Sequence, residues 1–284
     1  MKSTYFKTVL AICLLGILAS CRKKEDLDIS NLFPEETETP SAIDNWITAN
    51  YTKPYNIAVK YRWQPFELAT DKTMVPIKEE KVIPVMDIIR LTWIEPYIKE
   101  AGLDFFLKYS PKQFVLVGSA KYNSNGTITL GEAESGKTIQ LLLLNYFDQK
   151  DQAFVKQMLH TIHHEFAHIL HQTIFYPREF KQVTPGGYTG NWNNTSEEDA
   201  LNMGFITPYA RASTDEDFVE MASTMLTEGK DGFETILDNI PDANGQSLIR
   251  EKAEIVKNYY FNTWKINFDS LQLKTYTAIV EATR

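Results

Sequence analysis

Two histidines four residues apart, His164 and His168, lie in a stretch whose apolar residues recur at helical spacing. On an α-helix such residues share one face, about 6 Å apart along the axis, so both imidazoles can converge on one metal ion. We therefore predict a helix over residues 150–174 that is held against a core. Its apolar positions are Phe154, Val155, Met158, Leu159, Ile162, Phe166, Ile169 and Leu170.

The residues from His164 to His168 spell H-E-x-x-H, the zinc-site pattern of a large group of metallopeptidases. Glu165 follows the first histidine, where its carboxylate can reach a metal-bound water and act as a general base. The two cysteines of the chain, Cys13 and Cys21, both lie near the N-terminus. A Zn²⁺ ion must therefore be held by histidine and carboxylate, as is usual for catalytic zinc with three protein ligands and an open position.

One candidate for the third ligand comes directly after the motif. Some zinc enzymes carry the longer pattern H-E-x-x-H-x-x-G-x-x-H, but this chain has Ile174 where the last histidine would be. His171 lies three residues after His168 on a similar face of the helix. His171 is therefore an alternative ligand, or a residue that contacts the site from behind the ligands.

A later segment offers Glu216 and Glu220, which share a face of a helix predicted from about 214 to 228. One could bind the metal while the other accepts a hydrogen bond from the free nitrogen of a ligating histidine. Ser213 and Glu216 also fit a capping box, in which both side chains only satisfy the start of a helix. We favour Glu216 as the ligand, with Glu220 as the alternative.

The N-terminus carries the features of a lipoprotein signal. Residues 1–20 combine a charged start with an apolar run that is too short to span a membrane, which predicts a signal peptide that is removed. Leu18-Ala19-Ser20-Cys21 matches the lipobox of bacterial lipoproteins, in which the cysteine becomes the lipidated first residue. An ordinary secretory signal is the alternative. Residues 21–40 are polar and acidic and predict a lipidated flexible tether. Within the tether, residues 24–26 resemble a tag for export to the cell surface.

We expect residues 41–284 to form one α+β domain, with a β-rich part to about residue 149 and a helical part from about 150. Helices are predicted from near Ser41 and over 84–101, where Gly102 is a stop signal. Strands are predicted over 55–63, 114–119, 127–133 and 138–146, the last three as an antiparallel meander before the active-site helix. The formal net charge of −8 gives no electrostatic footprint for nucleic acid.

The H-E-x-x-H motif and residues 216–220 together resemble the gluzincin metallopeptidases. The resemblance is strongest to the putative zinc-binding metallopeptidase family of outer-membrane lipoproteins, also called substrate import-associated zinc metallohydrolase lipoproteins. The glutamate-rich segment is also similar to that of the anthrax lethal factor catalytic domain, where the first glutamate is a ligand and a tyrosine seven residues earlier steadies the oxyanion. The resemblance implies a zincin-like fold with Glu216 as ligand, Glu220 behind it and Tyr209 as electrophilic helper.

These residues predict a zinc-dependent hydrolase, above all a peptidase, that uses a metal-activated water with Glu165 as general base. The strand predicted over 127–133 could pair with an extended peptide or protein substrate. The resemblance implies anchoring to the outer membrane through Cys21, at the cell surface or on the periplasmic face, beside a TonB-dependent importer with its SusD-like lipoprotein. A non-catalytic zinc-containing binding lipoprotein that assists an importer is the first alternative. A glycan- or glycoprotein-directed hydrolase is the second.

Overall fold

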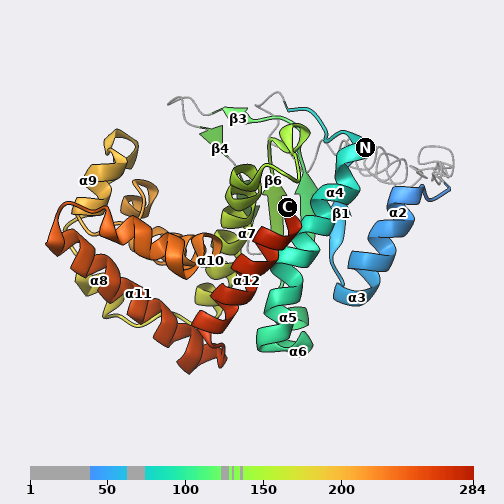
Figure 1. Cartoon of the computed structure of the whole chain (residues 1–284). Helices are drawn as coiled ribbons and strands as arrows, with labels where there is room; N and C mark the ends of the chain where they lie inside the picture. The colour runs from blue at the N-terminus through green and yellow to red at the C-terminus, as the bar shows by residue number, and fades with distance from the viewer. Residues whose placement is uncertain (1–38, 63–73, 123–127, 130, 135–136) are drawn as a thin grey trace, which may run out of the picture. The chain divides into compact units, whose positions relative to one another are not determined.

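The computed structural model describes residues 39–62, 74–122, 128–129, 131–134 and 137–284 (Figure 1). Contacts divide the chain into two units, Met1–Thr39 and Pro40–Arg284, and the elements below belong to the second unit. The predicted signal peptide, the predicted lipidation site Cys21 and all but the last two residues of the predicted tether lie outside the described residues. Within the described part of the chain, no helix is long and apolar enough to cross a bilayer.

Helices flank the first strand of this unit. Ser41 caps α2, because its hydroxyl accepts a hydrogen bond from Asp44 N at 3.1 Å while Asp44 Oδ2 accepts one from Ser41 N at 2.8 Å. A continuous helical stretch over 79–101 ends at Gly102, whose φ of +87° favours glycine. Both predicted helices are therefore confirmed. The elements are α2 (Ala42–Ile47), η2 (Thr48–Thr52), α3 (Lys53–Tyr55), β1 (Ala58–Lys60), α4 (Glu79–Ile89), η4 (Arg90–Ile94), α5 (Glu95–Ala101) and α6 (Leu103–Tyr109).

The main sheet has four strands in the order β1-β2-β6-β5. Its further members are β2 (Gln113–Leu116), β5 (Gly131–Glu134) and β6 (Thr138–Leu141). Strands β1, β2 and β6 run parallel, and β5 alone pairs in the antiparallel direction, with β6. The predicted antiparallel sheet is therefore wrong. A separate antiparallel pair is formed by β3 (Lys121–Tyr122) and β4 (Ile128–Thr129).

Two excursions of the chain produce the parallel pairing. Helices α4 to α6 lie between β1 and β2, and such a crossover returns the second strand in the direction of the first. Strands β3, β4 and β5 lie between β2 and β6. The strand predicted over 138–146 ends at Leu141, before the 3-10 turn η5 (Leu144–Tyr146). The part before residue 150 thus contains more helix than predicted.

The motif lies on α7 (Gln152–Thr173), which contacts β5 and β6 and is the helix predicted over 150–174. Phe166 anchors the apolar face of α7. Its ring meets those of Trp93 and Tyr97 edge-on, at centroid distances of 5.4 and 4.9 Å, and all three side chains are buried. His164 and His168 are each two residues from Phe166, so they are fixed on the opposite face.

The regular elements after α7 are helices joined by loops, and α10 packs against α7, α11 and α12. Helix α10 bends at Gly229, where φ is +70° and an added Cβ would lie 2.6 Å from Cγ of Tyr276. The elements after α7 are α8 (Phe180–Val183), η6 (Trp192–Asn194), α9 (Glu197–Asn202), η7 (Tyr209–Ala212), α10 (Thr214–Asp238), α11 (Ala243–Trp264) and α12 (Phe268–Ala282). The fold is a helix-rich α+β arrangement around a small sheet.

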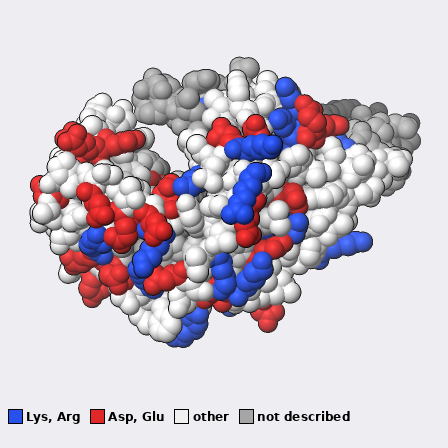
Figure 2. Space-filling model, viewed as in Figure 1, with Lys and Arg blue, Asp and Glu red and all other residues white. Residues whose placement is uncertain are grey.

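Charge is unevenly distributed over the face shown in Figure 2. Helix α9 begins with Glu197, Glu198 and Asp199. Acidic side chains gather at the upper left of Figure 2, where α9 lies in Figure 1. Over the helices below α9, basic and acidic side chains are interspersed. Part of the acidic excess of the chain is thus concentrated at α9.

Candidate metal centre

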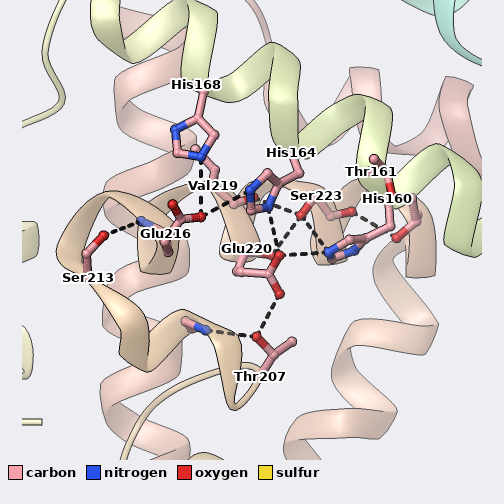
Figure 3. A network of polar contacts seen from close by, with 12 residues as sticks. His160, Thr161, His164, His168, Thr207, Ser213, Glu216, Val219, Glu220 and Ser223 are labelled. Carbon is pink, nitrogen blue, oxygen red and sulfur yellow. Dashed lines mark hydrogen bonds and ion pairs between the residues drawn. The ribbon is translucent and has the colours of Figure 1, made fainter. Parts of the chain in front are cut away.

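His164 and His168 occupy successive turns of α7 and face α10 (Figure 3). Their ring centroids are 4.8 Å apart, with the planes inclined at 75°. His164 is buried, whereas His168 is half-buried. The pair therefore stands at the edge of the core, where one ring is held by packing and the other meets solvent.

Glu216 comes from the first turn of α10. Ser213 caps this helix, since its Oγ accepts a hydrogen bond from Glu216 N at 3.1 Å. The side chain of Glu216 turns to the histidines instead, with Oε2 at 3.1 Å from His164 Nε2 and 3.3 Å from His168 Nε2. Donor atoms of these three residues all lie within 4.8 Å of one another. Glu216 thus serves the cap through its backbone and faces the histidines with its carboxylate.

Glu220, one turn later on α10, contacts the other nitrogen of His164. Its Oε1 lies 2.8 Å from His164 Nδ1 and 2.9 Å from His160 Nε2, and its Oε2 accepts a hydrogen bond from Thr207 Oγ1 at 2.6 Å. Burial favours the neutral form of Glu220, but His160 and His164 outweigh it and hold the pKa well below its usual range. Glu220 therefore stays ionised behind the ring of His164.

The two glutamates also reverse the effect of burial on His164. Burial alone would lower the pKa of His164, but hydrogen bonds to Glu216 and Glu220 raise it to about 10. Burial would raise the pKa of Glu216, yet His164 and His168 lower it to about 2. In the metal-free chain, a proton on His164 therefore occupies the nitrogen that a divalent cation would need.

His171 stands behind His168, with His171 Nε2 at 2.9 Å from His168 Nδ1. Burial, and then the nearby His168, lower the pKa of His171 to about 4, so its ring is neutral and Nε2 can accept a hydrogen bond. Within the described part of the chain, metal-donor atoms converge in two groups, His164 with His168 and Glu216 and His164 with His160 and Glu220, and His171 belongs to neither. Its position is that of a residue that orients His168.

This donor set fits Zn²⁺. Nδ1 of His164 is directed at Glu220 and Nδ1 of His168 at His171, so the Nε2 atoms of both rings face Glu216. Two imidazole nitrogens and one carboxylate oxygen form the ligand set of many catalytic zinc sites, and outer partners on Nδ1 fix the tautomer that such sites require. His164, His168 and Glu216 would hold the ion.

Two further predicted residues adjoin this group. The charge of Glu165 contributes to raising the pKa of both His164 and Tyr209, so its carboxylate lies within electrostatic range of this group. The ring of Tyr209 stacks on that of His164 with centroids 5.9 Å apart, and Trp192 meets Tyr209 edge-on at 4.9 Å. Burial, and then the charges of the surrounding glutamates, raise the pKa of the Tyr209 hydroxyl, so it stays protonated at neutral pH.

His160 and Thr207 are members of the cluster that sequence reasoning did not identify. His160 could have been found, because it lies four residues before His164 and so shares its helical face. Thr207 carries no comparable signal, since it reaches Glu220 from the loop before η7. The fold alone brings Thr207 to the site.

Comparisons with known proteins agree with this arrangement. A family model described as "Putative zinc-binding metallo-peptidase" matches residues 36–269. The chain is similar to the crystal structure of a putative zinc-binding metallo-peptidase from Bacteroides caccae, with 33% sequence identity and a TM-score of 0.72 over 85% of this chain and 91% of the other. Curated proteins give no match. The predicted membership of the putative zinc-binding metallo-peptidase family is confirmed, and the chain belongs to that family.

Proposed function

We propose that the chain is a zinc-dependent peptidase. The observation that carries the proposal is the convergence of His164 Nε2, His168 Nε2 and Glu216 Oε2, two imidazole nitrogens and one carboxylate oxygen of the kinds that zinc prefers. Glu165, whose charge acts on this group, supports catalysis over a structural role, because a structural site has no use for a base. Structural zinc sites are also usually closed by a fourth protein ligand.

The proposed reaction is the hydrolysis of a peptide bond. Zinc, when bound, would supply a Lewis acid that lowers the pKa of a water to about 7 and polarises the scissile carbonyl. Glu165 would remove a proton from the attacking water and deliver it to the leaving nitrogen, as the new C–O bond forms and the C–N bond breaks. Tyr209, kept protonated by its raised pKa, would donate a hydrogen bond to the carbonyl oxygen as negative charge develops.

An extended substrate would pair with β5. This strand comes last in the order β1-β2-β6-β5, so it forms one edge of the main sheet and pairs only with β6 in that sheet. It also contacts α7, which carries the motif. The unpaired backbone groups of an edge strand can accept a peptide as a further strand. The backbone would then hold the peptide next to His164 and His168, with specificity left to the side chains.

Zinc content combined with a peptide-library digest tests the proposal. The wild-type chain should bind zinc and cleave peptides. Glu165→Gln should keep zinc, because Glu165 is not a ligand. Its turnover rate should be about 10²–10⁴-fold lower than that of the wild type. Undiminished cleavage by Glu165→Gln would refute the proposed mechanism. A wild-type chain that binds zinc but cleaves no peptide would favour the accessory binding protein, and cleavage of a glycan instead would favour the glycan-directed hydrolase.

We further propose that the chain is lipidated at Cys21 and anchored to the outer membrane, where it serves a TonB-dependent importer with its SusD-like lipoprotein. The lipobox supports the first part, and the resemblance supports the second. Labelled palmitate should be incorporated by the wild-type chain and not by Cys21→Ala. Protease treatment of intact cells should remove the chain if it is displayed at the cell surface and spare it on the periplasmic face.

A further inference from the structure

Three side-chain donors enclose the carboxylate of Glu220. His164 Nδ1 and His160 Nε2 lie 2.8 and 2.9 Å from Oε1, and Thr207 Oγ1 lies 2.6 Å from Oε2. Figure 3 shows that the two histidines approach from α7 and Thr207 from the opposite side. The Glu220 side chain is 6% exposed, against 29% for His160. His160 therefore lies between the buried carboxylate and solvent.

The hydrogen-bond directions in this group follow from His164. If Nε2 of His164 binds a metal ion, Nδ1 must carry the proton and donate it to Glu220. An ionised carboxylate only accepts hydrogen bonds, so Nε2 of His160 must be a donor as well. The hydroxyl of Ser223 donates to Val219 O at 2.8 Å, and its oxygen lies 3.3 Å from His160 Nε2, where it can accept the longer branch of a bifurcated hydrogen bond from the same N–H. The position of the His160 ring is thus fixed by two partners on α10.

We propose, on the basis of the zinc function proposed above, that His160 is a positioning residue of the metal centre. His160 faces Glu220, and Glu220 in turn holds the ring of His164. By fixing Oε1 of Glu220, His160 sets the orientation of His164 and keeps a negative charge against its Nδ1. Without His160, the carboxylate can rotate and water replaces a fixed donor, so His164 binds the ion less tightly.

Zinc affinity of the purified chain, measured by competition with a chelator, tests this role. His160→Ala removes the donor and should weaken zinc binding about tenfold, the lower end of the range for outer partners of a ligand. His160→Gln carries an amide N–H that can reach Glu220 from a similar position, and it should restore most of the affinity. The visible absorption spectrum of the Co²⁺-substituted chain should change in His160→Ala and return in His160→Gln, because it reports ligand orientation.

Thr161→Ala is the matched control on α7, since the Thr161 hydroxyl donates to its own helix, to Gln157 O at 3.3 Å. It should bind zinc like the wild type. Thr207→Val removes the donor to the other oxygen of Glu220 and should also weaken zinc binding. It tests whether fixing the Glu220 carboxylate strengthens zinc binding, the step through which His160 acts, even if His160→Ala does not fold.

Equal zinc affinity in His160→Ala and the wild type would overturn the inference. So would a His160→Gln variant that binds zinc as weakly as His160→Ala, because the hydrogen bond would then not be the cause. A wild-type chain that binds no zinc would refute the proposed function, and the positioning role would fall with it. The two failures are therefore distinguishable in one set of measurements.

Discussion

Glu216 and Glu220 contact opposite nitrogens of one imidazole: Glu216 Oε2 lies 3.1 Å from Nε2 of His164, and Glu220 Oε1 lies 2.8 Å from Nδ1. The two acids are one turn apart on α10, so the helix presents one carboxylate in front of the ring and the other behind it. Nε2 of His164 shares the contact to Glu216 with Nε2 of His168, whereas Nδ1 of His164 faces Glu220. Their contributions to metal binding should therefore differ in size.

Replacing the two glutamates separately should show that difference. Glu216→Ala removes a ligand and should leave no zinc on the chain after dialysis. Glu220→Ala removes only the partner of His164 Nδ1 and should weaken zinc binding about 10–100-fold. Elemental analysis and chelator competition measure both effects. A greater loss in Glu220→Ala than in Glu216→Ala would exchange the two roles.

Tyr209→Phe should separate catalysis from metal binding. The substitution keeps the ring that stacks on His164 and removes only the hydroxyl. We expect kcat to fall about 10²-fold, the usual effect of losing one donor to an oxyanion, while zinc affinity stays the same. Tyr146→Phe is the control, because Tyr146 is 74% exposed on η5. This substitution should change neither kcat nor zinc affinity. An unchanged kcat in Tyr209→Phe would remove Tyr209 from the mechanism.

A buried ion pair next to the site should be important for stability. Lys252 Nζ on α11 lies 2.6 Å from Asp217 Oδ2 on α10, and both side chains are 0% exposed. Lys252 also donates to Gly204 O at 2.7 Å. Lys252→Met leaves the carboxylate of Asp217 buried without this cation and should cost about 3–5 kcal/mol of unfolding free energy in urea.

The double variant Lys252→Met with Asp217→Asn should recover part of that loss, because neither group is then a buried unpaired charge. The coupling between the two positions is read from a double-mutant cycle. Additive losses would show that the pair does not act as a unit. Arg250→Met is the control, since Arg250 pairs with Glu234 on the surface, where the expected change is within about 1 kcal/mol.

Zinc binding should release protons. His164 has a pKa of about 10 in the metal-free chain, against an ordinary value of 6.5, so it is protonated at pH 7.5 and must lose a proton to bind zinc through Nε2. Calorimetry in buffers of different ionisation enthalpy should detect release of about one proton. Because the folded pKa is raised, His164 stabilises the metal-free chain fully below pH 6.5, and this contribution is lost as the pH rises towards 10.

Local sequence was sufficient to predict the helix that carries the motif. Apolar residues at helical spacing and the pair His164 and His168 define both the extent of α7 and the face it turns to the site. Ser213 likewise marks the start of α10. The contacts of Glu216 and Glu220 could not be derived in the same way, because they share a helical face and their partners depend on how α10 crosses α7.

The direction of the sheet could not be predicted for a related reason. Residues 58–60 pair with 113–115, and residues 113–116 pair with 138–141, so each pair of strands is far apart in the sequence. The path of the helices and strands that connect the paired strands decides whether they run parallel or antiparallel. A strand of three residues such as β1 carries little alternation to signal a partner. The contact of Thr207 with Glu220 could not be predicted for the same reason, since only the packed fold brings the two residues together.

The cluster contains two sets of converging donors, and His164 is a member of both: His164 with His168 and Glu216, and His164 with His160 and Glu220. An imidazole that carries a proton on Nδ1 has a lone pair on Nε2 alone, so filling the first set disables the second. Five side chains that look sufficient for a binuclear cluster therefore have room for a single cation. Titration with zinc should saturate at one equivalent per chain.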